Sequence, residues 1–384
     1  MRRTLRGAGF WWVVSLVCLL CAANAGPATS WQLSQGNPSD GLLRAIVYVN
    51  GNFVVASRGQ LLRSIDGVTW TRAGAVQFDD ITFGQDTYAA VGLWAGIQTS
   101  PDGVTWTQRI LKAGARDRVR NAIAYGNGTF VSISGESAGL FWTHYIETSR
   151  DGIEWGDTRR AEFGQGGDDF GITFANGMFV AVGFNAIYTS TDAISSNSWT
   201  RHTYSPPVRL HDVVYADDRF LAVGSGGTIL SSPDAATWTA LNSSVTSELR
   251  GVAWGQGTFV AVGDGGTILT STNGSDWVRQ DSGVTVSLND VCYANNQFVA
   301  VGENGTILQS TNVEPPTLSG KYVADGGFNL TLAGGTAPAY RIQSSADLES
   351  WADLVTVTNT QGLTHYTDTA ATVLNQRFYR VLSR

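Results

Sequence analysis

Few side chains of the chain have the types and spacing that catalysis or metal binding requires. The four histidines, His144, His202, His211 and His365, are scattered, and no two stand at the spacing of zinc ligands. No nucleophile elbow or phosphate-binding loop occurs. Cys292 takes the place of a small residue in a repeated strand phrase, which favours a buried packing role. We therefore expect no metal, no cofactor and no catalytic residue of these kinds.

A second group of residues, all but one of them polar, is defined by its distance from an aromatic residue that recurs along the chain. Each member stands nine positions before that aromatic: Arg44, Asp79, Asn121, Phe170, His211, Arg250 and Asn289. Asp80, Asp212 and Asp290 each follow one of them directly. If the strands that begin here converge on an axis, these side chains line the mouth of a channel. Such mouths are usually only solvated, and the alternative is a site for a small ligand or ion.

The most irregular segment of the chain is rich in aromatic and basic residues. Its candidate binding residues, with those in the turns of the neighbouring repeats, are Phe141, Trp142, His144, Tyr145, Arg116, Arg118, Arg120, Trp94 and Phe184. An aromatic and arginine patch on an acidic protein has the composition of a recognition surface. The alternative is a local cluster under the loop, in which the arginines pair with Glu136, Glu162 and Asp168.

A phrase repeated seven times must position these residues. Each copy joins an aliphatic residue to an aromatic residue seven positions later, over 46–53, 81–88, 123–130, 172–179, 213–220, 252–259 and 291–298. Another aromatic stands two residues after the aliphatic, which is the alternation of a strand. Asn-Gly, Gly-Asn-Gly or Asp-Asp between the apolar runs predicts a tight hairpin.

Each phrase is followed by a second hairpin and by a turn of the pattern Ser-x-Asp-Gly-x-x-Trp, exact or loosened. The residues at the aspartate position are Asp66, Asp102, Asp151, Asp192, Asp234 and Asn273. A turn accepts asparagine at this position, whereas an acid catalyst would not. Four strands in about forty residues is the content of one β-propeller blade.

The two ends of the repeat region complement each other. The seventh repeat stops at Asn312 without its tryptophan, and Trp31 lies ahead of the first repeat. If residues 30–33 supply the outer strand of the last blade, the ring has no broken seam. The sequence therefore predicts an all-β fold in which a seven-bladed β-propeller over residues 26–313 is closed by an N-terminal strand.

The repeated turns resemble the Asp-box, or BNR, repeat of sialidase-type propellers. Together with the Phe-Val-Ala-Val-Gly and Gly-Gly-Thr-Ile-Leu phrases, they more closely resemble the photosystem II stability and assembly factor group. The resemblance covers about residues 30–313, and it implies structural turn roles for Asp66, Asp102 and Asp151. A sialidase also needs converging arginines, of which the mouth positions supply only Arg44 and Arg250.

The first 25 residues have the three parts of a secretory leader, with an arginine-rich start, an apolar run over 10–23 and Ala-Asn-Ala before Gly26. The apolar run is shorter than the roughly 20 residues of a spanning helix, so we expect cleavage and no stable membrane insertion. Cleavage removes three arginines and changes the net charge from −7 to −10. This charge argues against nucleic-acid binding. Only Cys292 remains, which predicts no internal disulfide.

Residues 314–384 form a separate region that begins with a proline-containing linker. Its short apolar runs predict a small β-sandwich. The segment from Tyr340 to Trp351 and the terminal Arg-Phe-Tyr-Arg-Val resemble a fibronectin-like C-terminal module of bacterial exported proteins. Tyr340 and Trp351 are interpreted as core residues.

Three functions are compatible with these patterns. The leading hypothesis is a noncatalytic, monomeric, exported propeller, periplasmic, cell-surface or extracellular, that binds a protein or glycan partner through the face of blades two to four. Its role would be that of an assembly factor or scaffold. The first alternative is a sialidase-like enzyme that acts on glycosides, which paired carboxylates in the channel would favour. The second is a structural module of the cell surface.

Overall fold

The computed structural model describes residues 30–383, apart from 35–40, 58, 75–76, 93–95, 110–117, 139–140, 162–169, 196, 206, 312–316, 323–326, 334–338, 347–349, 359–363 and 370–376. The expected leader, residues 1–25, lies outside this part of the chain. By their internal contacts, residues 29–312 and residues 313–384 belong to two different compact units.

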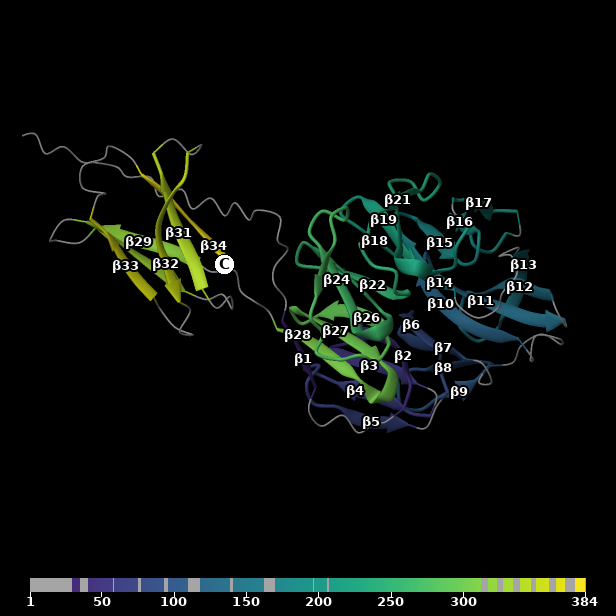
Figure 1. The fold of residues 1–384 in the computed structure, drawn as a ribbon. Helices are drawn as coiled ribbons and strands as arrows, with labels where there is room; N and C mark the ends of the chain where they lie inside the picture. The colour runs from purple at the N-terminus through teal and green to yellow at the C-terminus, as the bar shows by residue number, and fades with distance from the viewer. Residues whose placement is uncertain are drawn as a thin grey trace, which may run out of the picture. The chain divides into compact units, whose positions relative to one another are not determined.

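The first unit contains seven four-stranded antiparallel sheets (Figure 1). We number them by the chain order of β2, β6, β10, β14, β18, β22 and β26. Sheets 1 to 3 consist of β2 (Leu43–Val49), β3 (Asn52–Ser57), β4 (Leu61–Ser64) and β5 (Thr71–Gly74); β6 (Asp80–Gly84), β7 (Thr87–Gly92), β8 (Gly96–Ser100) and β9 (Thr107–Gln108); and β10 (Val119–Gly126), β11 (Thr129–Ala138), β12 (Phe141–Ser149) and β13 (Gly156–Ala161).

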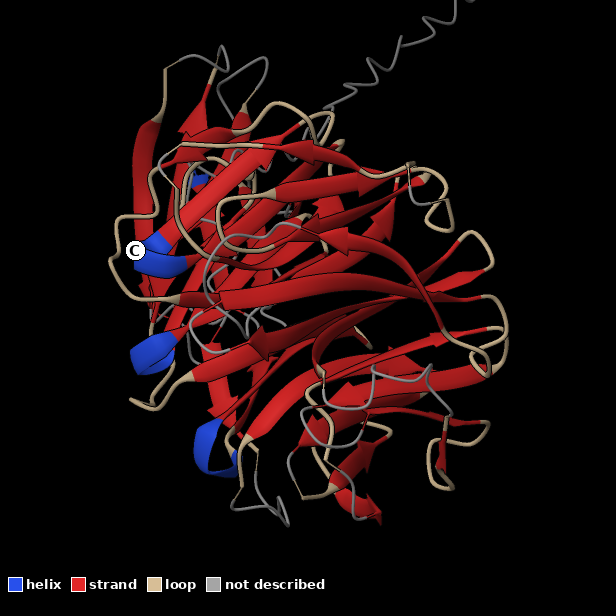
Figure 2. Cartoon of the chain, turned by 90° about the vertical axis from the view of Figure 1, so that its right-hand side faces the viewer, coloured by secondary structure: helices blue, strands red, loops and turns tan. Residues whose placement is uncertain are grey.

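The later sheets contain three short 3₁₀ turns between their second and third strands, drawn in blue in Figure 2. Sheets 4 to 6 consist of β14 (Gly171–Ala175), β15 (Met178–Val182), β16 (Ile187–Ser190) and β17 (Thr200–His202); β18 (Leu210–Ala216), β19 (Arg219–Gly224), η1 (Ser225–Gly227), β20 (Thr228–Ser232) and β21 (Thr239–Leu241); and β22 (Leu249–Gly255), β23 (Thr258–Gly263), η2 (Asp264–Gly266), β24 (Thr267–Ser271) and β25 (Val278–Gln280). Sheet 7 is made of β26 (Leu288–Ala294), β27 (Gln297–Gly302), η3 (Glu303–Gly305), β28 (Ile307–Thr311) and β1 (Ser30–Leu33).

The first hairpin of each sheet forms where the repeated phrase predicts it. In sheet 1, Asn50 and Gly51 have φ angles of 49° and 78° between β2 and β3. Two consecutive residues with positive φ make the tight turn that matches the twist of paired strands. Asn295 and Asn296 adopt the same conformation in sheet 7, because asparagine tolerates the left-handed region better than most residues.

Neighbouring sheets pack face to face through their apolar side chains. The innermost strands touch in the order β2, β6, β10, β14, β18, β22 and β26, and β26 also touches β2. Glycines permit the close approach at several of these contacts. A Cβ atom on Gly126 would lie 1.9 Å from the ring of Phe174 in the next sheet. The positions that begin the innermost strands are therefore held around a common centre.

Sheet 7 combines the two ends of the first unit. Its outer strand β1 pairs antiparallel with β28, so that Trp31 stands opposite Ser310. Trp31 is buried among side chains that include Val262, Leu288 and Leu308. The pairing is the one that the position of Trp31 in the sequence predicts.

The repeated turn between the third and fourth strands is held by its own side chains. In sheet 1, Asp66 Oδ1 accepts the backbone N–H groups of Val68 and Thr69, each at 2.8 Å, and the Ser64 hydroxyl at 2.9 Å. Trp70 lies below the turn and donates its indole N–H to the Gly67 carbonyl at 2.9 Å. These contacts stabilise the six-residue loop 65–70 between β4 and β5 through the loop's own groups and Ser64.

We expect Trp70→Phe to lower the free energy of unfolding by about 1–2 kcal/mol, because the phenyl ring keeps most of the packing and loses the hydrogen bond. Trp277→Phe is the matched control, since the indole nitrogen of Trp277 is buried and has no hydrogen-bond partner among the described residues. Urea unfolding of both variants measures the difference. Equal losses would show that the indole–carbonyl bond contributes nothing.

The second unit contains two three-stranded antiparallel sheets over residues 313–384. The strand orders are β29–β30–β33 and β32–β31–β34, for β29 (Thr317–Tyr322), β30 (Phe328–Ala333), β31 (Ala339–Ser345), β32 (Ala352–Thr358), β33 (Thr364–Asp368) and β34 (Phe378–Ser383). Tyr340 is buried in the core that they share, as expected, and Trp351 is half-buried under the Arg380 guanidinium. The described parts of both units are all-β, which confirms this part of the predicted fold.

Candidate functional site

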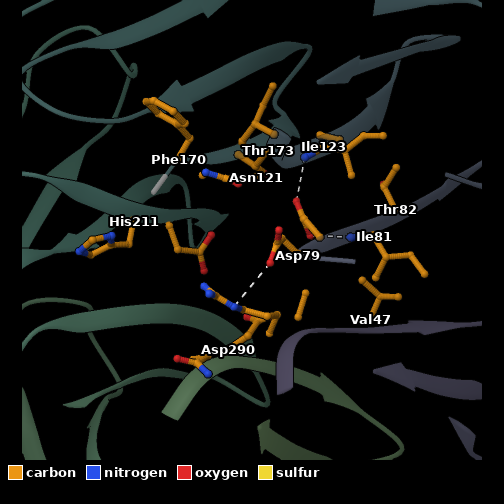
Figure 3. A pocket seen from close by; sticks show the side chains of 18 of the residues that line it. Val47, Asp79, Ile81, Thr82, Asn121, Ile123, Phe170, Thr173, His211 and Asp290 are labelled. Atoms are coloured by element: carbon orange, nitrogen blue, oxygen red, sulfur yellow. Dashed lines mark hydrogen bonds and ion pairs between the residues drawn. The ribbon is translucent and has the colours of Figure 1, made fainter. Parts of the chain in front are cut away.

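The seven positions nine residues before the recurring aromatic meet at one cavity. The cavity has a volume of about 720 Å³ and is lined by all seven of them. Figure 3 shows Asp79, Asn121, Phe170 and His211 among the side chains that line it. We call these residues the mouth ring: Arg44, Asp79, Asn121, Phe170, His211, Arg250 and Asn289. The structure therefore brings together residues that are more than 200 positions apart in the sequence.

The cationic members of the mouth ring are each held by an acidic neighbour. Arg44 Nε lies 3.5 Å from Asp79 Oδ1, and Arg250 makes two hydrogen bonds to Asp264, of 2.7 and 3.3 Å. Burial raises the pKa of Asp264 and its bond to Arg250 lowers it, and the lowering prevails. These pairs hold each guanidinium group in one orientation at the cavity. A polar ligand would therefore meet hydrogen-bond donors that are already oriented.

The imidazole of His211 takes part in a similar arrangement. His211 Nε2 and Glu248 Oε1 are 2.6 Å apart, and Ser225 donates its hydroxyl to the same oxygen at 3.0 Å. His211 is buried, whereas Glu248 keeps 31% of its side chain exposed. This trio joins sheet 5 to the segment that leads into sheet 6. Asn289 joins sheet 7 to sheet 1 by donating to the Leu43 carbonyl at 2.7 Å.

Three carboxylates stand one residue further along the innermost strands. We call Asp80, Asp212 and Asp290 the aspartate layer. Each uses one oxygen to accept the next backbone N–H of its own strand at 2.7 Å. The other oxygen accepts an N–H of the following sheet, from Ile123 at 2.8 Å, Val252 at 2.8 Å and Ile46 at 2.7 Å respectively. The layer therefore joins sheet 2 to 3, sheet 5 to 6 and sheet 7 to 1.

Burial dominates the ionisation of the aspartate layer. It raises the pKa of Asp80 to about 7, against the lowering effect of the two N–H donors. It also raises the pKa of Asp212 to about 6 and that of Asp290 well above the ordinary value. The charges of the layer act on one another, because Asp212 raises the pKa of both other members.

The turn aspartates have the opposite electrostatics. The Thr105 and Val104 N–H groups lower the pKa of Asp102 to about 2. Backbone donors also lower the pKa values of Asp66, Asp151 and Asp234. In Asp192 the main cause of the lowering is the Ser195 hydroxyl, and Asn273 accepts the N–H groups of Ser275 and Asp276 instead. None of these groups lines the cavity.

The arginines of the expected recognition surface are inside sheet 3. Arg120 is fully buried, and Arg118 is 6% exposed. Glu147, on β12 and also buried, accepts Arg120 Nε at 2.7 Å, Arg120 Nη2 at 2.8 Å and Arg118 Nη1 at 3.1 Å. Arg118 also lies 3.5 Å over the ring of Tyr145, with Glu136 at 3.9 Å. These two arginines therefore form a buried network and not the exposed patch that the sequence predicts, because their charges are neutralised within the sheet.

The remaining residues of that surface have varied positions. His144 is buried against the edge of Phe170, and burial lowers its pKa to about 4. Phe184 is half-buried and forms a bridge with Arg209. Trp94 and Arg116, and the side chains of Phe141 and Trp142, lie outside the described residues, as do Glu162 and Asp168. Their role in binding stays a prediction.

Sequence reasoning missed three residues of these sites. Arg209 and Glu248 each stand two positions before a mouth-ring residue, which is the signal that could have found them. Glu147 occupies the strand position that Leu230, Leu269 and Leu308 hold in later repeats. A charged residue at a repeated leucine position predicts a buried partner of opposite charge.

No group of three or more His, Cys, Asp or Glu side chains in the described part of the chain is placed to hold a metal ion. No helix among the described residues has the length and apolar character needed to cross a membrane.

The architecture and the cavity at its centre define the class of this protein. The fold is a β-propeller, as the likeness to solved propeller structures also shows. No family model matches the sequence, and no curated protein matches it.

Among solved structures, the chain is similar to YCF48. YCF48 from Cyanidioschyzon merolae is 17% identical with a TM-score of 0.57, over 74% of this chain and 99% of that one. A structure of YCF48 bound to D1 peptide is 19% identical with a TM-score of 0.58, over 76% and 99%. The WD40 β-propeller domain of Doa1 is 14% identical with a TM-score of 0.57, over 74% and 98%. At these identities the likeness concerns the fold.

Proposed function

We propose that this chain is an exported, noncatalytic propeller that binds an extended segment of a partner protein at the mouth ring. The observation that carries the proposal is the cavity of about 720 Å³, which is lined by the mouth ring and in which Arg44, Arg250 and Asn289 are held by neighbouring groups. A propeller of similar fold, YCF48, has been solved with a D1 peptide bound. An assembly-factor role, in which the chain holds one segment of a client protein, fits both facts.

The finer architecture belongs to the same proposal. The seven sheets are the blades of one closed ring, and β1 completes the last blade. The turns are Asp-box repeats, and residues 314–384 form an accessory β-sandwich. Removal of residues 1–25 gives the mature, monomeric protein. The pairing of β1 with β28 and the contact of β26 with β2 support the closed ring.

The geometry favours binding over glycoside hydrolysis. A general acid or nucleophile must reach the substrate with its reactive oxygen. In the aspartate layer both oxygens of each carboxylate already accept backbone N–H groups from two strands. These carboxylates therefore hold neighbouring sheets together. The mouth ring is the part of the cavity that can recognise a ligand.

We expect the purified chain to enrich specific sequences from a random dodecapeptide library displayed on phage. Arg250→Ala should weaken binding of the enriched peptides by about tenfold or more, because a charge-assisted hydrogen bond contributes about 1.5–3 kcal/mol. Fluorescence polarisation of the labelled peptides measures the dissociation constants.

Arg279→Ala is the matched control, since Arg279 is an exposed arginine on the outer strand β25 of the same sheet. It should change binding by less than about twofold. Thermal melting checks that both variants are folded. Enrichment of no peptide, or equal binding by Arg250→Ala and the wild type, would overturn the proposal. Binding to a glycan array under the same conditions would replace the protein partner by a glycan.

A further inference from the structure

The aspartate layer alternates with small residues around the centre of the first unit. The equivalent positions in the other four sheets are occupied by Ala45, Ala122, Gly171 and Gly251. Space explains the alternation. A Cβ atom on Gly251 would lie 2.9 Å from Asp290 Cα, and one on Gly171 would lie 2.7 Å from Asp212 Cα. A carboxylate on one strand thus requires a small neighbour on an adjacent strand, and three acidic side chains share one narrow level of the cavity.

The same spacing sets which amide each carboxylate binds. The amides reached across the sheet boundary belong to Ile46, Ile123 and Val252, which directly follow Ala45, Ala122 and Gly251. The small side chain therefore leaves room for the carboxylate to reach the backbone N–H of the residue that follows it. Because this occurs three times around the centre, the layer is a repeated joint between sheets.

Several charged or titratable groups surround the layer. Asp79 acts on Asp80, Cys292 lies two residues after Asp290, and His211 precedes Asp212. Burial raises the pKa of the Cys292 thiol well above its ordinary value, so the thiol stays neutral at the acidic and neutral pH values where the carboxyl groups titrate. The cations that line the same cavity are Arg44, Arg209 and Arg250. Arg44 and Arg250 already have the acidic partners Asp79 and Asp264, so they do not neutralise the layer fully.

We propose that the aspartate layer is a proton-linked clasp, which holds neighbouring sheets together in its partly protonated form and loosens as its three carboxyl groups become ionised together. The reason is electrostatic. One ionised member is stabilised by two N–H donors, whereas three ionised members that are all buried repel one another. A protonated member keeps its carbonyl oxygen for an amide and directs its O–H toward the cavity. This clasp is independent of any partner bound at the mouth ring.

The sign of the pH dependence follows from linkage. The folded chain holds protons on these groups at a pH where the unfolded chain has lost them, because their pKa values are raised from the ordinary 3.8. The added stability is complete below about pH 4 and is lost as the pH rises through about 6 to 7. Each group changes the unfolding equilibrium constant by at most about tenfold per pH unit.

Two histidines contribute a pH dependence of stability with the opposite sign, and the measurement must cancel this contribution. Burial lowers the pKa of His144 to about 4 and also lowers the pKa of His202, so the stability that each contributes rises with pH up to about 6.5. The comparison is therefore made between variants that share both histidines. It starts at pH 4.5, where the turn aspartates with their lowered pKa values are already ionised.

The experiment compares the wild type with the Asp80→Asn, Asp212→Asn, Asp290→Asn triple variant by urea unfolding from pH 4.5 to 8. We expect the unfolding constant of the wild type, relative to the triple variant, to rise by about 100-fold or more over this range, as protons leave at least two groups. Asp218→Asn is the control and should follow the wild type. Asp218 is an exposed turn residue, and asparagine occupies the corresponding turn of sheet 7.

A second readout does not require the variants to fold. Carbon-13 NMR of the aspartate carboxyl carbons in the folded wild type should show three groups that titrate well above the ordinary pKa of 3.8, with coupled curves. Single Asp80→Asn, Asp212→Asn and Asp290→Asn variants assign them. Titration of all aspartates near pH 4, or parallel unfolding profiles for the wild type and the asparagine variants, would overturn the clasp.

Discussion

Glu147→Ala should lower the free energy of unfolding by about 3–5 kcal/mol, because it leaves two guanidinium groups inside sheet 3 without their main anion. Glu147 is 2% exposed and accepts three hydrogen bonds, two from Arg120 and one from Arg118. Glu136 is 3.9 Å from Arg118 and half-exposed, so it cannot replace Glu147. Chemical denaturation at neutral pH measures the loss.

The size of the effect depends on charge balance, which a second variant tests. Arg120→Met should cost less than Glu147→Ala, because it leaves Arg118 and Glu147 as a one-to-one pair. Glu154→Ala is the control on an exposed turn of the same sheet and should stay within about 0.5 kcal/mol of the wild type. If Glu147→Ala were as mild as Glu154→Ala, the network would not be a buried ion cluster.

Trp31→Ala should lower the free energy of unfolding by about 3–5 kcal/mol, since it removes a buried aromatic side chain from the boundary of sheets 6 and 7. The strand that carries it has only four residues and one partner strand. With the anchor removed, the loss of β1 should follow, and sheet 7 should expose its edge. Urea unfolding and proteolysis at the N-terminal segment measure both effects.

Leu33→Ala provides the comparison within the same strand. Leu33 is 51% exposed and keeps its backbone pairing with Leu308 after the substitution. The expected change is within about 0.5 kcal/mol. A loss for Trp31→Ala no larger than that for Leu33→Ala would mean that β1 is not anchored by its tryptophan.

The repeated elements could be predicted from the sequence because local rules and long-range packing agree in them. Strand β3 (Asn52–Ser57) follows β2 directly across the tight turn at Asn50-Gly51, and this turn fixes the register of the two strands. The mouth ring could be found for the same reason. Seven equivalent strands with a common origin must bring equivalent positions together, so one count of nine residues located Arg44 and His211 in the same cavity.

The environment of Arg118 and Arg120 could not be read in the same way. A basic run in a polar linker resembles an exposed surface until its partner is known, and the partner Glu147 lies on a strand two positions away in the sheet. Burial of a charge is a tertiary property, because it depends on a neutralising group on another strand, which the basic run itself does not specify. The sequence predicts where the aspartate layer lies, whereas its hydrogen bonds across sheet boundaries depend on how the sheets pack in the folded chain.

The position of β1 has a consequence for how the molecule is made. The strand that leaves the ribosome first completes the sheet whose other strands leave last, at residues 288–311. A nascent chain stopped before β28 therefore has no partner strand for β1, which must stay unpaired until residues 307–311 have been made. The final step joins residues from opposite ends of the unit, which predicts slow, late completion of folding. Shortening either end of residues 30–311 should damage the same sheet.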